Sequence, residues 1–211
     1  MPAAAPLAPT ASLLRRLGGH QTAMWAAALA APCADAGITT PARLAAFLAN
    51  VLHETGGFAR LVENMSYSAE RLVQVWPSRF PDLAAARPFA RKPKALAERV
   101  YGGRMGNIHP GDGWRFRGRG LLQTTGRDNY ARLAQATGRA LDDLPAWLET
   151  PAGAAESATR FWAWRGCNAP ADAGDLEQVR RMINGGLIGM ADVARQHRAA
   201  LAAIAEETRT R

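Results

Sequence analysis

Cysteine is scarce in this sequence, which has Cys33 and Cys167 as its only two in 211 residues. Two cysteines cannot form a disulfide framework, and no C-x-x-C spacing typical of structural zinc is present. One bridge between them is an alternative, but two free buried thiols are the favoured interpretation. We therefore expect no disulfide-stapled scaffold, no bound metal and no cofactor.

Long apolar runs are also missing, because none approaches the ~18 residues that span a membrane. The first residues, "MPAAAPLAPTASLLRRLGG", begin with prolines and carry their basic residues after the apolar ones. That order is the reverse of a secretory signal. We therefore expect synthesis in the cytoplasm without a signal peptide and no stable membrane insertion.

Acidic residues are outnumbered, with 18 Asp and Glu against 26 Lys and Arg, and the net charge is +8. Such an excess favours a polyanionic partner, namely nucleic acid, an anionic membrane surface or a bacterial cell wall. A composition bias of the source genome is the alternative, since the arginines are scattered. No G-x-S-x-G motif or P-loop is present. Metal-ligand spacing is also lacking among the histidines, which are His20, His53, His109 and His197.

The domain organisation is simple. Residues 1–10 are rich in alanine and proline, and we expect them to be disordered. Residues 11–211 contain no linker, internal repeat or shift in composition. A chain of this length fits one domain, so we predict a single catalytic domain over 11–211.

The sequence signals that start and end helices are clear along the chain. Thr40 is an N-cap candidate and Pro41 suits the first helical position, which predicts a helix through Thr55 that Gly56 and Gly57 end. Strand signals are weak, so the predicted fold class is mainly α. Further helices are predicted over residues 12–32, 93–101, 151–165, 176–183 and 190–207. The glycine-rich segment 102–120 is predicted to be a long loop or one short hairpin, and loops of this length are usually functional.

The stretch "FLANVLHETGGFARLVEN", residues 47–64, contains two glutamates nine positions apart. Glu54 lies at the edge of an apolar helical stripe. Partial desolvation there favours the protonated carboxyl, as proton donation to a glycosidic oxygen requires. The alternative is a boundary glutamate paired with an arginine.

Glu63 follows the double glycine, which frees the chain to turn back. A carboxylate in such a polar loop stays ionised and can activate a water, although most loop glutamates are only solvated surface groups. Two carboxylates in different environments are what glycoside hydrolysis needs.

Three motifs in order resemble the family 19 glycoside hydrolases, and most closely the short bacteriophage and prophage endolysins of that family. They are "LHETGGF" with "VEN", then "GWRFRGRGLLQTTGRDNY", then "RRMINGGLIGM", and the resemblance covers about residues 12–200. It implies a bilobed, lysozyme-like, helix-rich fold with a cleft between the lobes. It also implies inverting hydrolysis of β-1,4 bonds in N-acetylhexosamine polymers.

The resemblance also implies roles for individual residues. Glu54 matches the general acid, Glu63 the general base, and Thr125 the hydroxyl that holds the attacking water. Three amides match substrate-binding residues, and they are Gln123, Asn129 and Asn184. Without the resemblance these would be ordinary loop polar groups, and Asn184 a helix-capping residue.

The sequence departs from the family pattern at two places. Position 124 is usually apolar and is threonine here. The glutamate that some larger members carry after "NGG" is replaced by Leu187-Ile188. We expect Arg181 or Arg195 to supply a cation beside the acid instead.

Other candidates surround the motifs. His53 is predicted to contact substrate and to hydrogen-bond Glu54 or the opposite lobe. Trp114 and Phe116 either present flat faces to sugar rings or are core aromatics flanked by solvated arginines. The remaining tryptophans considered are predicted to pack in the core or between lobes, and they are Trp76, Trp147, Trp162 and Trp164.

The favoured function is an endolysin-type glycosidase of peptidoglycan, most simply a muramidase, that works as a monomer and reaches the wall through holin-type or other release. The positive charge fits the anionic wall better than neutral chitin. A chitinase is the alternative within the class. A non-enzymatic basic module that binds glycan or nucleic acid is the alternative outside it, although we expect no nucleic-acid partner.

Overall fold

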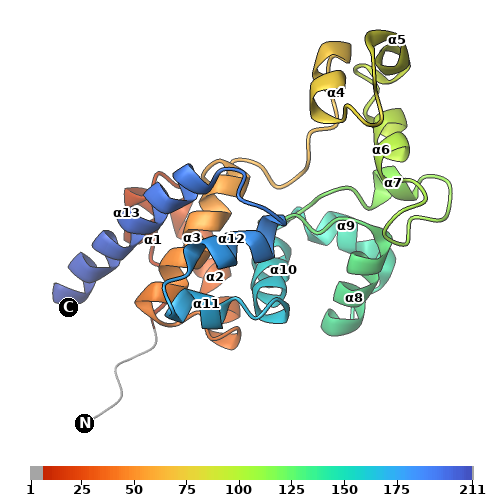
Figure 1. Cartoon of the computed structure of the whole chain (residues 1–211). Coiled ribbons are helices and arrows are strands. Elements are labelled where there is room, and N and C mark those ends of the chain that lie inside the picture. Colours follow the sequence, from red (N-terminus) through yellow and green to blue (C-terminus); the bar gives the residue numbers. More distant parts are fainter. Residues whose placement is uncertain (1–6, 211) are drawn as a thin grey trace. The chain divides into compact units, whose positions relative to one another are not determined.

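A computed structural model describes residues 7–210, which form thirteen α-helices and two short 3-10 helices (Figure 1). The prediction of a mainly helical protein is confirmed. Within residues 7–210, extended pairing is limited to two isolated bridges, Val62 with Arg119 and Arg119 with Thr124. Of the two alternatives for segment 102–120, the long loop is observed rather than a hairpin. The loop contains one helical turn, and only Arg119 takes part in the isolated bridges.

The elements follow in chain order. They are α1 (Ala11–Arg16), α2 (Thr22–Asp35), α3 (Pro41–Thr55), α4 (Ala69–Val75), α5 (Leu83–Ala86), η1 (Arg87–Phe89), α6 (Pro93–Tyr101), α7 (Asp112–Arg115), α8 (Arg127–Thr137), η2 (Leu141–Asp143), α9 (Leu144–Trp147), α10 (Pro151–Trp164), α11 (Asn168–Asp172), α12 (Leu176–Asn184) and α13 (Met190–Arg209).

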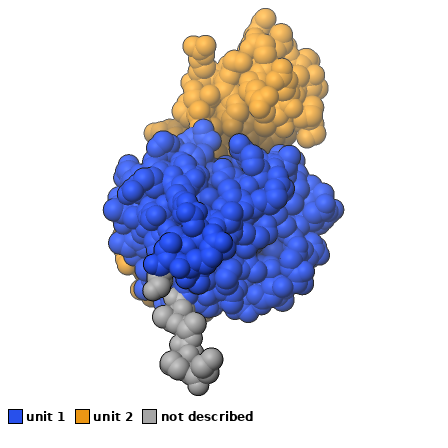
Figure 2. Space-filling model, turned by 90° about the vertical axis from the view of Figure 1, so that its left-hand side faces the viewer, with its two compact units in different colours: residues 1–61, 120–122, 147–211 blue, residues 62–119, 123–146 orange. Residues whose placement is uncertain are grey.

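The chain divides into two compact units (Figure 2). Unit 1 contains Met1–Leu61, Gly120–Leu122 and Trp147–Arg211, and unit 2 contains Val62–Arg119 and Gln123–Ala146. Residues 1–6 of the expected tail lie outside the described residues. Residues 7–10 are ordered in unit 1, where the Leu7 amide donates to the Thr39 carbonyl at 3.2 Å and the Thr10 hydroxyl caps α1.

The predicted boundaries of α3 are confirmed. The Thr40 hydroxyl accepts a hydrogen bond from the Arg43 amide, and Gly56 ends the helix in the left-handed conformation with φ 61°. The predicted helix over 12–32 is wrong, because α1 and α2 are separate. Gly19 lies in the turn between them, where a methyl group would be 2.9 Å from the Leu14 carbonyl oxygen. This close approach excludes a side chain.

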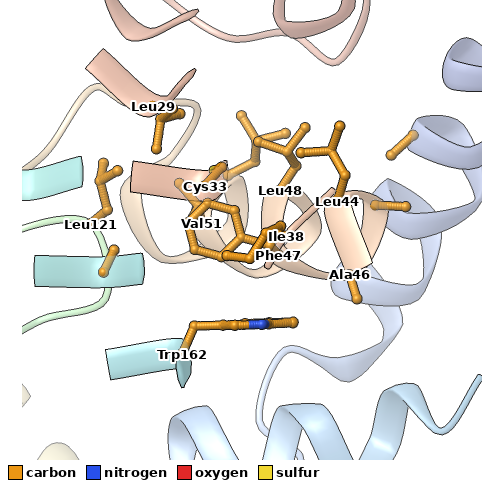
Figure 3. Packing of buried hydrophobic residues seen from close by; sticks show 14 of the residues in the cluster. Leu29, Cys33, Ile38, Leu44, Ala46, Phe47, Leu48, Val51, Leu121 and Trp162 are labelled. Carbon is orange, nitrogen blue, oxygen red and sulfur yellow. The ribbon is translucent and has the colours of Figure 1, made fainter. Parts of the chain in front are cut away.

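The core of unit 1 is built around α3, which packs against α13 and α12. Phe47 of α3 meets Trp162 of α10 edge to face, with ring centroids 5.5 Å apart (Figure 3). Trp162 is fully buried, as predicted, whereas Trp164 is 36% exposed and its predicted packing role is wrong. Cys33 and Cys167 are both buried and free, which agrees with the favoured interpretation.

Unit 2 has its own smaller core. Leu72 of α4, Phe80 and Leu96 of α6 are completely buried in it, and Tyr101 and Trp114 pack against it. Trp76 also packs there and meets Tyr67 edge to face at 5.2 Å. This core holds α6 in place, and α6 carries a partner of Glu63.

No helix within residues 7–210 is both long and apolar enough to cross a membrane.

Candidate active site

Glu54 lies in the last turn of α3 and contacts a buried arginine of α12. Arg180 Nη1 is 2.6 Å from Glu54 Oε1 and 3.2 Å from Asn50 Oδ1. The Arg180 side chain is 2% exposed and that of Glu54 is 24% exposed. The glutamate is thus partly buried, as predicted, but it is paired with a cation, as the alternative interpretation held.

The two arginines predicted to provide this cation are the wrong ones. Arg181, next to Arg180, points outward and pairs with Glu177 at 3.4 Å. Arg195 pairs with Asp192 on α13. Sequence reasoning missed Arg180, yet the helical period holds the signal: Arg180 follows buried Val179 and faces the core, while Arg181 faces solvent.

Arg180 also fixes the loop between α12 and α13. Its Nε donates to the Ile188 carbonyl at 2.9 Å, and its Nη2 donates to the same oxygen at 2.6 Å. A buried charge is tolerated only when it is paired and its donors are satisfied. One guanidinium therefore holds both the Glu54 carboxylate and the loop that follows Asn184.

His53 forms a hydrogen bond within unit 1. Its Nδ1 is 2.7 Å from Asp192 Oδ2 of α13, a partner that was not predicted from the sequence. Hydrogen bonds from His53 and then from Arg195 hold the pKa of Asp192 below its ordinary value. A methyl group at Gly189 would lie 2.1 Å from His53 Nε2, so the ring packs directly on that backbone. A role of His53 in binding substrate stays a prediction.

Asn184 ends α12 at an exposed position, followed by Gly185 in the left-handed conformation. Its Nδ2 is 3.5 Å from the Ile188 carbonyl oxygen, a marginal hydrogen-bond distance. The amide is therefore open to other partners, as a substrate-binding residue would be. The capping interaction belongs to Gly185 rather than to the Asn184 side chain.

Glu63 lies in unit 2 and is held by three polar contacts. The Tyr101 hydroxyl donates to its Oε1 at 2.6 Å, and the Gly118 amide donates to its Oε2 at 3.3 Å. The Glu63 amide donates in turn to the Gly118 carbonyl at 3.0 Å. Burial, followed by the Glu63 charge, raises the pKa of Tyr101, so its hydroxyl remains a donor. No sequence motif pointed to this tyrosine.

Gly118 marks the point where three predicted site residues meet. A methyl group there would lie 2.4 Å from Gln123 Oε1, 3.2 Å from Thr125 Oγ1 and 3.3 Å from Glu63 Oε2. The carboxylate of Glu63, the hydroxyl of Thr125 and the side-chain amide of Gln123 thus converge on the Gly118 backbone, which leaves no room for a side chain there. The structure brings together Glu63, Gln123 and Thr125 from separate parts of the sequence.

The backbone of this loop is constrained. Gln123 has φ 45°, in the left-handed region that residues with a side chain rarely adopt. Thr124 and Arg119 exchange backbone hydrogen bonds of 2.7 and 3.1 Å. The Asn129 side chain donates to the Thr125 carbonyl at 2.7 Å, which fixes the backbone two residues before α8 begins. A strained backbone held by its surroundings is typical of a functional site.

Arg119 is a second buried arginine that sequence reasoning did not identify. It is 5% exposed, and its Nη1 donates to the Arg115 carbonyl at 2.7 Å and lies 3.0 Å from the Tyr130 hydroxyl. It supports the turn that contains Gly118. The interpretation of all arginines in "WRFRGRG" as solvated is wrong at this position.

The two aromatic candidates differ. Phe116 is completely buried and meets Tyr130 edge to face at 5.1 Å, so it is a core residue and cannot stack on a sugar. Trp114 is partly buried, and the Arg117 guanidinium carbon lies 3.7 Å from the centre of its ring. One face of Trp114 is therefore already covered by a cation.

A pocket of about 420 Å³ lies elsewhere in unit 1, between α2 and α10. Its lining includes Pro32, Glu156 and Trp164 but none of the predicted site residues. Within the described part of the chain, no group of three or more His, Cys, Asp or Glu side chains is arranged to hold a metal ion.

Comparison with known proteins agrees with the geometry. No protein-family model matches the chain. The chain is 40% identical over 176 residues to a "Glycosyl hydrolase family 19 domain-containing protein" of Haemophilus influenzae, covering 82% of this chain and 85% of that protein. Among solved structures, chitinase C from Streptomyces griseus HUT6037 superposes with a TM-score of 0.62 at 18% identity, covering 96% of this chain and 95% of that one. At that identity the likeness shows a shared fold.

Proposed function

Because this chain belongs to glycosyl hydrolase family 19, we propose that it hydrolyses β-1,4 bonds of peptidoglycan glycan strands, as an endolysin-type muramidase. Family membership favours an enzyme over the non-enzymatic binding module considered from the sequence. Synthesis in the cytoplasm, action at the bacterial wall after holin-type or other release, and a monomeric state are parts of the same proposal.

The observation that supports the chemistry best is the convergence of Glu63 and Thr125 on the Gly118 backbone. Glu63 Oε1 accepts from the Tyr101 hydroxyl, while Oε2 and Thr125 Oγ1 would both lie close to a methyl group on Gly118. A water bound by these two oxygens can donate one proton to Glu63 and accept or donate a hydrogen bond at Thr125. Fixing a water in this way is what an inverting attack on an anomeric carbon requires.

Glu54 is assigned as the general acid. It protonates the oxygen of the departing sugar and becomes a carboxylate in that step. Arg180, 2.6 Å away and buried, stabilises the carboxylate so formed. Glu63 accepts the proton of the attacking water, and the new hydroxyl forms on the face opposite the broken bond.

The amides complete the proposal for substrate binding. Gln123, Asn129 and Asn184 carry side chains that both donate and accept hydrogen bonds, which suits N-acetyl and hydroxyl groups. Asn129 already donates to the Thr125 carbonyl, so its amide oxygen is the group it offers to a sugar.

Peptidoglycan is proposed over chitin because of charge. The protein carries +8, the wall is anionic and chitin is close to neutral. A chitinase is the second candidate, favoured by the structural likeness to a protein that is itself a chitinase.

The proposal is tested by mass spectrometry of borohydride-reduced fragments released from Gram-negative peptidoglycan, with Glu54→Gln as the control. Fragments that end in reduced N-acetylmuramic acid, absent from the control, are the expected result. Fragments that end in reduced N-acetylglucosamine would indicate a glucosaminidase instead. No release from the wall, together with cleavage of N-acetylglucosamine oligomers, would establish the chitinase.

A further inference from the structure

The positive charge of this protein is concentrated in one part of unit 2. Residues 66–104 contain eight basic and three acidic residues, a net charge of +5 out of the +8 of the whole chain. The basic residues are Arg71, Arg79, Arg87, Arg91, Lys92, Lys94, Arg99 and Arg104. We call these eight side chains the basic surface.

The basic surface is exposed and is not neutralised by carboxylates. Seven of its eight members are exposed, and Arg79 is half-buried. None of the eight forms an ion pair with any residue from 7 to 210, whereas other arginines do, among them Arg16, Arg43 and Arg160. Unpaired charges of one sign on a surface leave a positive potential available to a partner.

The three acidic residues of the segment form no ion pair with the basic surface and lie at helix ends or bind backbone amides. The Asp82 carboxylate caps α5 by accepting from the Ala85 amide at 2.8 Å. Glu98 Oε1 accepts from the Trp114 amide at 2.8 Å. Glu70 lies in the first turn of α4, beside its N-cap Ser68. These carboxylates support local backbone structure rather than pairing with the basic surface.

The elements that carry the charges form one cluster. Along the chain, α4 contacts α5, α5 contacts η1 and η1 contacts α6, and residues of these elements form the small core of unit 2. The charges of Arg87 and Arg91 contribute to lowering the pKa of Glu70, after the larger effect of its hydrogen bonds to Ser68 and to its own backbone. The charges of Arg87 in η1 and Arg91 just after it are therefore close enough to influence Glu70 at the start of α4.

The cluster is continuous with the candidate base. Tyr101, the last residue of α6, donates the 2.6 Å hydrogen bond to Glu63. Lys94 and Arg99 belong to the same nine-residue helix, and Arg104 follows three residues after Tyr101. At 1.5 Å per residue, α6 is roughly 14 Å long. A polymer held by the basic surface thus lies within a short distance of Glu63.

We propose that the basic surface binds the carboxylates of the peptide stems of peptidoglycan and so makes the enzyme prefer an anionic glycan to a neutral one. This inference rests on the proposed function. Stems project from the strand at regular intervals and end in carboxylates. The guanidinium and ammonium groups of the basic surface can form ion pairs with these carboxylates. The contacts are exposed, so they are sensitive to salt.

The test compares two triple variants that remove the same charge from the two units. Arg87→Gln/Arg91→Gln/Lys94→Gln reduces the basic surface. Arg15→Gln/Arg198→Gln/Arg209→Gln is the matched control, because these three arginines of unit 1 are exposed and form no ion pair within the described residues. For both variants and the wild type, kcat/KM is measured on soluble peptidoglycan strands and on a neutral N-acetylglucosamine hexamer, at low and at high salt.

The basic-surface variant is expected to lose about tenfold in kcat/KM on peptidoglycan at low salt. Its activity on the hexamer should be unchanged, high salt should remove the difference, and the control should keep wild-type activity on both. Equal losses in both triple variants would overturn the inference, because net charge alone would then be responsible. An equal loss on the hexamer would overturn it as well.

Failure of the proposed function would be visible separately. A wild-type enzyme that cleaves the hexamer but not peptidoglycan contradicts the proposed substrate before any variant is made. A wild-type enzyme that cleaves peptidoglycan, with a basic-surface variant that matches it at every salt concentration, contradicts only the basic surface.

Discussion

Arg180 is the residue on which Glu54 and the neighbouring loop both depend. Its guanidinium donates four hydrogen bonds, one each to Glu54 and Asn50 and two to the Ile188 carbonyl, and its side chain is 2% exposed. Removing one partner of a buried ion pair leaves the other charge without compensation, which is costly. Glu54 is 24% exposed, so water offsets part of that cost.

We predict that Arg180→Met lowers the free energy of unfolding by about 3 kcal/mol and reduces kcat. Arg180→Lys should rescue only part of both, because an ammonium cannot hold Glu54 and the Ile188 carbonyl in one fork. Urea unfolding and kcat report the two effects. The control is Arg181→Met, whose exposed pair with Glu177 is worth less than about 1 kcal/mol; equal losses in the two variants would refute this role for Arg180.

Gly118 offers a test of the second carboxylate without removing any functional group. In Gly118→Ala the new methyl would collide with the Gln123 amide and crowd Thr125 and Glu63. We predict a loss of about 100-fold in kcat with the helical circular dichroism spectrum retained. Wild-type kcat in this variant would show that the reacting water is not held by Glu63 and Thr125 beside Gly118.

The Thr125 hydroxyl lies beside Gly118, near the Glu63 carboxylate. We predict that Thr125→Ala loses part of the activity and that Thr125→Ser, which keeps the hydroxyl, retains most of it. Steady-state kinetics on one substrate checks both variants. Equal kcat in the alanine and serine variants would argue that the hydroxyl does not orient the water.

Short motifs predicted Glu63, Gln123 and Thr125 as site residues, and the structure brings these three side chains together. Their roles in catalysis and binding stay predictions. The contacts of Arg180, Arg119 and Tyr101 were not predicted, because their partners are distant in the sequence or are backbone groups. Nothing local distinguishes a buried, satisfied arginine from a solvated one.

At the scale of elements, the capping pattern was informative. The caps at Thr40, Ser68, Thr150 and Asp175 each accept from the amide three residues later. The break between α1 and α2 was missed, because an alanine- and leucine-rich run reads as continuous helix even when two glycines interrupt it. Glycine is required at position 19 because its Cα lies close to the Leu14 carbonyl oxygen in the folded chain. Such a contact produces no periodic pattern in the sequence.

The contact between His53 and Asp192 links α3 to α13 and has a pH signature. The folded pKa of Asp192 lies below its ordinary value of 3.8, so the contact stabilises the fold above pH 3.8 and is lost as pH falls through the folded pKa. We predict that wild type is more stable than Asp192→Asn at pH 6, and that the difference shrinks as pH falls below 3.8 and disappears below the folded pKa of Asp192. Urea unfolding across pH 2.5–6 measures this; a difference that is undiminished at the lowest pH would contradict it.

At the scale of the whole molecule, two separate cores stabilise two units, and both cysteines lie in the core of unit 1. Burial raises the pKa of Cys33 to about 12 and that of Cys167 to about 11. Since the thiolate is the reactive form, we predict that neither thiol reacts with Ellman's reagent at pH 8 in the native protein and that both react in urea. A rapidly reacting thiol in the native state would contradict the burial.

The fold class was predictable because helix caps, apolar periodicity and motif order are properties of nearby residues. The resemblance to family 19 also implied two lobes, but the boundaries of the two units were not predictable, because unit 1 is assembled from three segments of the chain and unit 2 from two. The concentration of charge in residues 66–104 is visible in the sequence, but its lack of neutralising partners became evident only in the structure.

We propose that Glu54 and Glu63 act together as acid and base on one bond. Proton NMR of the first product formed from a β-1,4-linked substrate, recorded before the new reducing end equilibrates, tests this directly. We predict that the α anomer appears first and that Glu54→Gln and Glu63→Gln form neither anomer at a comparable rate. Initial formation of the β anomer, or full turnover in either variant, would contradict it.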